Sequence, residues 1–176
     1  GLKPGYNEVS SPETAGFHEY FGDAVAMMAS LGTEETAFSV AEESGETLSA
    51  RNVVSAIASE FGAALQGLPD EDYLRGAWND RTVQALRKER SLEEHDWSEV
   101  LTGIYYELLA YLYKSNRRAI ASERGDALPA RASKERAKAE EQYRSMRALV
   151  RSATQTAGVM FRAIDYCPPI DLRYDE

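Results

Sequence analysis

The amino-acid sequence predicts an all-α, multi-helix domain. Several long segments repeat apolar residues at the three- and four-residue spacing of an amphipathic helix, and no segment alternates apolar and polar residues as a strand does. No internal repeat of fixed period is visible. The chain has 176 residues, 43% of them hydrophobic, which is enough to bury the core of one domain. We therefore expect residues 1–176 to form a single helical domain.

The helical pattern is strongest in four segments, and the stretches between them are richer in Gly, Pro and polar residues. The predicted helices span residues 14–32, 53–65, 97–124 and 133–165. The segment 33–50 is rich in Glu, Ser, Thr and Gly, so it is predicted to be a loop. Residues 66–96 contain two Gly, one Pro, one Asn and several charged residues, and short helical turns separated by loops are expected there.

Charge and composition narrow the range of partners. The net charge is −9, and basic residues are mostly interleaved with acidic ones, so we expect no nucleic-acid partner. No run approaches the roughly 18 apolar residues that span a bilayer, so no membrane partner is expected. The single cysteine, Cys167, has no second thiol for a disulfide or a Cys-based zinc site. Because the sequence begins at Gly1 rather than Met, we expect it to lie within a longer polypeptide.

The segment 16–24 carries the most informative residues. Glu19 and Asp23 are four residues apart and share one helix face. Two acids on one face repel each other, so they either form a solvated surface or hold a cation or a hydrogen-bonded histidine between them. Gly22 lies between them and destabilises a helix by about 1 kcal/mol relative to Ala. We expect Gly22 to allow the close approach of another element.

The Glu-x-x-x-Asp pattern at the start of a predicted helix resembles the third-ligand helix of the thermolysin-like zinc metallopeptidases, the gluzincins. In that family a His-Glu-x-x-His helix supplies two zinc ligands and a general base, and a later helix supplies a Glu ligand. The resemblance implies that Glu19 ligates zinc. It also implies that Asp23 accepts a hydrogen bond from a ligating histidine, which fixes the orientation of that ring.

Two further segments resemble the same family in the same order. Residues 73–80, Tyr-Leu-Arg-Gly-Ala-Trp-Asn-Asp, resemble a Leu-Arg segment followed closely by Asp. This match implies that Arg75 contacts a substrate carbonyl. Residues 95–98 precede a predicted helix and resemble a His-x-x-Ser motif, which implies that His95 stabilises the oxyanion of the tetrahedral intermediate.

The resemblance covers roughly residues 10–115 through short motifs, and the terminal helix more loosely. The spacing between Glu19 and Arg75 is longer than is usual in the family, and an inserted loop at 33–51 would account for the difference. Without the resemblance, Arg75 could equally be an ordinary surface arginine. His95 could equally be a solvated residue before a helix.

The sequence departs from the family at one decisive point. Its two histidines are His18 and His95, and neither begins a His-Glu-x-x-His motif. The resemblance therefore implies that zinc is completed by an N-terminal peptidase half outside this chain. His18 lies about 100° around the helix from Glu19, so a surface or packing role is expected for it. A carboxylate-bridged di-iron bundle does not fit, because neither histidine has Glu three residues before it.

Two functions stay open at this point. The first is the C-terminal part of a zinc-dependent endopeptidase, inactive alone, which acts on a peptide or protein substrate. The second is a non-catalytic helical interaction module or a decayed peptidase domain. The first requires Glu19, Asp23, Arg75 and His95 to converge on one open face, with carboxylates that are free of internal ion pairs.

Overall fold

The computed structural model describes residues 11–48, 52–56, 76–123 and 133–166, and these residues contain five helices and no strand. The all-α prediction is confirmed. The helices are α1 (Pro12–Leu31), α2 (Glu34–Ser44), α4 (Val83–Glu89), α5 (Glu94–Glu123) and α6 (Lys134–Asp165). Of these, none combines the length and the apolar character needed to cross a membrane.

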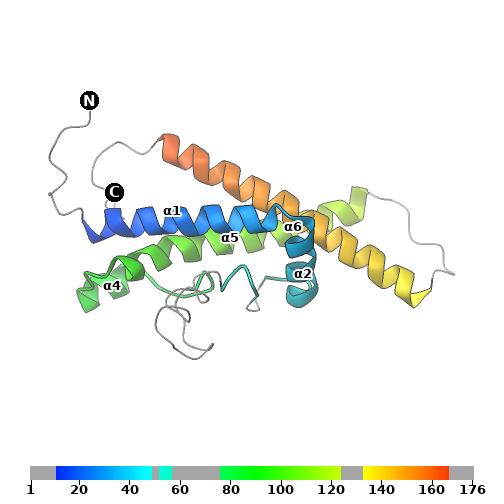
Figure 1. Ribbon diagram of the computed structural model, residues 1–176, viewed down its shortest axis with the longest axis horizontal. Helices are drawn as coiled ribbons and strands as arrows, with labels where there is room; N and C mark the ends of the chain where they lie inside the picture. Colours follow the sequence, from blue (N-terminus) through cyan, green and yellow to red (C-terminus); the bar gives the residue numbers. More distant parts are fainter. Residues whose placement is uncertain (1–10, 49–51, 57–75, 124–132, 167–176) are drawn as a thin grey trace.

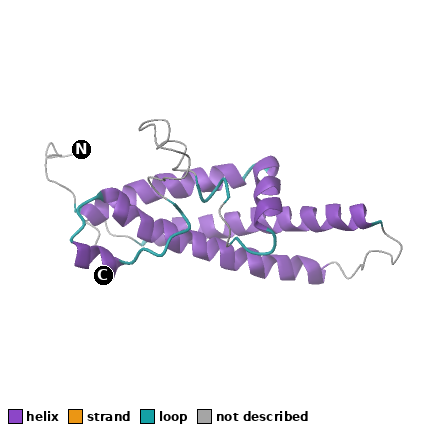
Figure 2. Cartoon of the chain, turned by 90° about the horizontal axis from the view of Figure 1, so that it is seen from below, coloured by secondary structure: helices purple, strands orange, loops and turns teal. Residues whose placement is uncertain are grey.

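Three long helices, α1, α5 and α6, form the body of the structure (Figure 1). α5 packs against both α1 and α6, and α1 and α6 also contact each other. The short α2 follows α1 closely in the chain and packs mainly on α6. Among the described helices, α4 packs on α5 alone. In the perpendicular view, α5 and α6 extend together along the long axis (Figure 2).

The core is made by apolar faces of the three long helices, as the sequence periodicity indicates. Met27 and Leu31 of α1, Leu109 and Tyr113 of α5, and Leu149 of α6 are almost completely buried in one cluster. Each such side chain contributes roughly 1.5–3 kcal/mol through removal of apolar surface from water. This shared core fixes how α1 lies along α5.

The segment 33–50 was predicted to be a loop, and that prediction is wrong for Glu34–Ser44, which form α2. Thr33 caps the helix, because its hydroxyl accepts a hydrogen bond from the Thr36 N–H at 3.4 Å. The acidic first turn is favourable at a helix N-terminus. The small apolar residues of α2 are buried against the core, so tertiary packing overrides the loop-like composition.

The other predicted elements agree more closely with the structure. Residues 133–165 are helical as expected, with Ser133 as the N-cap. α4 is one of the short helical turns expected within 66–96. α5 begins at Glu94, three residues before the predicted start, because the Ser91 hydroxyl accepts from the Glu93 N–H and acidic residues fill the first turn. Most of the predicted helix 53–65 lies outside the described residues.

A buried polar network joins the segment after α2 to α5. The Asn52 amide donates to the Tyr106 hydroxyl at 2.6 Å and to Ser44 Oγ at 3.2 Å. Its carbonyl oxygen accepts from the backbone N–H groups of Val54 and Ser55. Every polar atom of the Asn52 side chain thus has a partner, as a buried amide requires.

α1 lies close against α5 at Gly16. A Cβ atom added there would lie 2.6 Å from Trp97 Cβ and 2.9 Å from Ser98 N. Those atoms belong to the first two turns of α5 and cannot move aside independently of the helix. Gly22 was expected to permit such an approach, and that expectation is wrong, because a Cβ at Gly22 would meet nothing within 4 Å.

The substitution of glycine by alanine is therefore expected to have opposite effects on stability at Gly16 and at Gly22. Gly16→Ala is expected to destabilise the protein by about 1–3 kcal/mol, because it overpacks the contact between α1 and α5. Gly22→Ala, the matched control, is expected to stabilise it by about 0.5–1 kcal/mol, because alanine favours an exposed helix interior. Urea unfolding followed by circular dichroism measures both. A neutral or stabilising Gly16→Ala would contradict the close approach.

Candidate functional site

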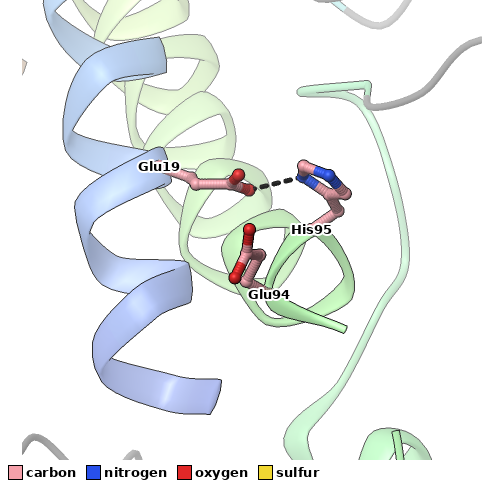
Figure 3. Close-up of side chains that lie close together, drawn as sticks. All are labelled: Glu19, Glu94 and His95. Atoms are coloured by element: carbon pink, nitrogen blue, oxygen red, sulfur yellow. Dashed lines mark hydrogen bonds and ion pairs between the residues drawn. The ribbon is translucent and has the colours of Figure 1, made fainter. Parts of the chain in front are cut away.

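One turn beyond Gly16, the side chain of Glu19 meets the start of α5. Glu19 Oε2 lies 2.7 Å from His95 Nδ1, although the two residues are 76 positions apart in the sequence (Figure 3). A carboxylate only accepts hydrogen bonds, so this contact places a proton on Nδ1 of His95. The side chains are 22% and 45% exposed, respectively. The pair is therefore accessible from solvent at the junction of α1 and α5.

Glu94 adds a third polar side chain to this pair. One ligand atom from each of Glu19, Glu94 and His95 lies within 4.8 Å of the others. In Figure 3, Glu94 and His95 project from the first turn of α5 toward Glu19 on α1. We call these three residues the Glu-His cluster. Sequence reasoning did not single out Glu94, although its position next to His95 was a usable signal.

The donor types of the Glu-His cluster fit zinc, which binds imidazole nitrogen and carboxylate oxygen. Two donors on one tetrahedral zinc ion lie roughly 3.4 Å apart, given metal–ligand distances near 2.1 Å. The 2.7 Å contact is shorter than this, so Glu19 Oε2 and His95 Nδ1 form a hydrogen bond with each other. A metal ion held by Glu19 would therefore use its other carboxylate oxygen or a rearranged side chain.

The local fold explains why His95 is held in place. The hydroxyl of Ser98 donates to the backbone oxygen of His95 at 2.7 Å, within the first turns of α5. Gly16 lies against the backbone of the same turns, so α1 cannot slide without disturbing His95. The hydrogen bond from Ser98 ties its side chain to the backbone of the first turn of α5.

The remaining predicted site residues lie differently. Asp23 is half-buried one turn after Glu19 on α1, engages a partner of its own and is not a member of the Glu-His cluster. His18 is exposed at the surface, as expected, with its ring edge-on to Phe17. Arg75 lies outside the described residues. The Glu19 carboxylate was expected to be free of internal ion pairs, and it instead contacts the ring of His95, one of the residues expected to converge with it.

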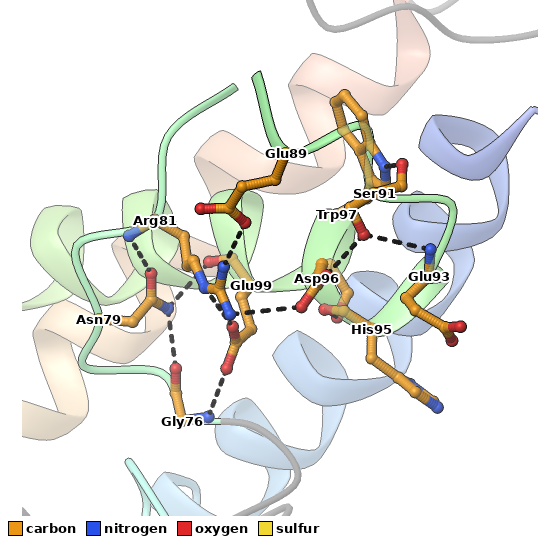
Figure 4. A network of polar contacts seen from close by, with 11 residues as sticks. Gly76, Asn79, Arg81, Glu89, Ser91, Glu93, His95, Asp96, Trp97 and Glu99 are labelled. Atoms are coloured by element: carbon orange, nitrogen blue, oxygen red, sulfur yellow. Dashed lines mark hydrogen bonds and ion pairs between the residues drawn. The ribbon is translucent and has the colours of Figure 1, made fainter. Parts of the chain in front are cut away.

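A second polar network, which sequence reasoning missed, lies beside the start of α5. The Arg81 guanidinium is 3.3 Å from Glu89, 3.4 Å from Asp96 and 3.3 Å from Glu99 (Figure 4). Asp96 and Glu99 are three residues apart, a spacing that places both on one helix face. That spacing was the available signal. The network ties the segment before α4 to the turns of α5 that follow His95.

Asn79 anchors the same segment through three hydrogen bonds. Its amide donates to the backbone oxygens of Gly76 at 2.8 Å and Glu99 at 2.9 Å, and its oxygen accepts from the Arg81 N–H at 3.0 Å. The amide lies against Gly103, where an added Cβ would come within 3.1 Å of it. Residues 76–82 are therefore fastened to α5 by specific contacts.

Burial raises the pKa of the Glu99 carboxyl group. Its side chain is 17% exposed, and this desolvation raises its pKa above the ordinary value of 4.5. Glu99 also accepts a hydrogen bond from the Gly76 N–H at 3.4 Å and lies near the positive charge of Arg81. Both effects lower the pKa of Glu99, but by less than desolvation raises it. The nearby Asp96 adds to the upward shift.

Comparisons with known proteins found no match. No family model matches the chain, and neither a curated protein nor a solved structure does.

The raised pKa of Glu99 predicts a specific pH dependence of stability. The folded state binds the Glu99 proton more tightly than the unfolded state, so this residue's contribution falls as the pH rises from near 4.5 through the folded pKa. We expect the unfolding free energy of the wild type, minus that of Glu99→Gln, to decrease over this interval. Urea unfolding at a series of pH values measures it. A difference that increases with pH would contradict the prediction.

Proposed function

We propose that this chain is the C-terminal helical part of a zinc-dependent endopeptidase and forms one wall of its active site. One observation carries the proposal. Glu19 and His95, to which the peptidase resemblance gives the roles of metal ligand and oxyanion-stabilising residue, meet at 2.7 Å on a partly exposed surface. The two motifs are on different helices. If both matches were coincidental, nothing would require the two residues to be adjacent in space.

In this proposal each residue of the chain has a defined task. Glu19 supplies a carboxylate to the metal, and a segment outside the chain supplies the two histidines and the general base. Zinc, when bound, polarises the scissile carbonyl and activates water. His95 lies beside Glu19 and stabilises the negative charge that develops on the carbonyl oxygen. Asp23 is proposed to orient a ligating histidine, and Arg75 is proposed to contact the substrate carbonyl.

A second function is favoured by one feature of the same contact. The Glu19 carboxylate already has a partner inside the chain, and its side chain is 22% exposed. A hydrogen-bonded pair of this kind can simply pin α1 to α5. In that case the chain is a helical interaction module or a decayed peptidase domain that keeps the packing without the chemistry.

Zinc binding to Glu19→Gln separates the two functions. In a polypeptide that joins a His-Glu-x-x-His segment to this chain, competition with a chromophoric chelator is expected to show that Glu19→Gln weakens zinc binding at least about tenfold. Glu107→Gln, which removes an exposed carboxylate from α5, is the matched control and is expected to leave the affinity unchanged. Equal zinc affinity in the wild type and Glu19→Gln would remove Glu19 as a ligand and favour the helical module.

Peptidase activity is the second readout of this experiment. The chain alone is expected to have none, because it lacks a His-Glu-x-x-His motif. In a polypeptide that joins such a segment to this chain, Glu19→Gln is expected to abolish zinc content and proteolysis while the helical circular dichroism is unchanged. Zinc-dependent proteolysis by the chain alone would contradict the proposed division of residues.

A further inference from the structure

A pocket of about 250 Å³ lies at the end of the bundle away from the Glu-His cluster. α5 and α6 form its walls, and the turn after α2 closes it. Its charged lining residues are Glu46, Lys114, Arg117, Arg118, Glu141 and Arg144. Four cations against two carboxylates give this lining a net charge of +2, although the whole chain carries −9. The pocket is therefore locally positive on an acidic chain.

Two of the four cations have no counter-ion among the residues that the structure describes. Lys114 and Arg118 are exposed on α5, and neither forms an ion pair within the described part of the chain. Arg144 is paired with Glu140 on its own helix at 3.2 Å. Lys114 and Arg118 are four residues apart on α5, so they present two positive charges on the same helix face.

Arg117 forms the inner wall of the pocket and is held rigidly. Its guanidinium pairs with Glu141 and lies 5.9 Å from the centre of the Tyr113 ring, and its side chain is 17% exposed. Its other carboxylate contact, with Glu46, is at 4.0 Å, and the Glu46 side chain is 88% exposed. An exposed ion pair at this distance contributes little to stability. Glu46 can therefore be displaced by a ligand of the same charge.

We propose that this pocket binds an oxyanion, such as a phosphate group or a carboxylate-bearing small molecule. The ligand takes the place of Glu46 beside Arg117 and is held by the unpaired charges of Lys114 and Arg118. Planar guanidinium groups and ammonium groups are the usual protein donors to such anions. This site is independent of the proposed peptidase function, because His95 and Lys114 are separated by roughly 30 Å along α5.

The proposal is tested with inorganic phosphate and succinate as separate probes, titrated at constant ionic strength and followed by amide chemical shifts. Saturable shifts at residues that line the pocket are expected with at least one probe. Lys114→Gln/Arg118→Gln is expected to raise its Kd at least about tenfold, since it removes both unpaired cations. Glu46→Gln is expected to lower the Kd by roughly threefold, because it removes the competing carboxylate.

Lys88→Gln/Arg162→Gln is the matched control. It makes the same change in net charge at exposed positions on α4 and α6 that do not line the pocket, so it is expected to leave the Kd unchanged. Binding of phosphate but not succinate assigns a phosphate ligand, and the reverse assigns a carboxylate. Absence of saturable shifts with both probes, or an equal loss of affinity in the control, would overturn the proposal. Neither outcome bears on zinc binding at Glu19.

Discussion

The contact of α1 with the first turns of α5 at Gly16 determines the arrangement of the candidate site. Only a residue without a side chain fits there, because a Cβ atom would lie within 3.0 Å of both the backbone and the side chain of α5. The helices therefore touch at a fixed height along both axes. Glu19 is less than one turn further along α1, so this constraint brings its carboxylate to His95. The core farther along α1 keeps the same alignment.

The polar groups around the start of α5 build on this contact. On one side Glu19, Glu94 and His95 form a partly exposed cluster of metal-binding groups. On the other side Arg81 is surrounded by carboxylates of α4 and α5 and holds the segment that follows residue 75 against α5. Both groups are positioned by the same few turns of helix. A substrate wall that uses this end of the bundle would thus rest on a well-anchored frame, as the proposed peptidase role requires.

The sequence predicted the helical class and the two longest helices because their apolar periodicity is strong. It did not predict α2, whose Glu- and Ser-rich composition resembles a loop and whose stability depends on burial of its small apolar residues against the core. It also selected the wrong glycine. Gly16 and Gly22 both interrupt the same helical pattern, and only the position of α5 shows which of them faces a neighbour. Local sequence does not contain that information.

The site was predicted in a similarly partial way. Motif matching identified Glu19 and His95, and the structure places them in contact. Motif matching missed Glu94, which becomes part of the cluster because the first turn of α5 directs it toward Glu19. It also missed Arg81, whose partners come from two helices. It did not predict that the histidine hydrogen-bonded to Glu19 would be His95. Partners that are distant in sequence decide each of these points.

The nitrogen-15 NMR spectrum of the His95 ring tests the central contact most directly. At a pH where the ring is neutral, the contact with Glu19 predicts that the proton is on Nδ1, and that Glu19→Gln changes this tautomer balance. The other histidine, His18, is exposed and provides an internal reference. A His95 ring with its proton on Nε2, or a spectrum that Glu19→Gln leaves unchanged, would show that α1 does not bring Glu19 to His95.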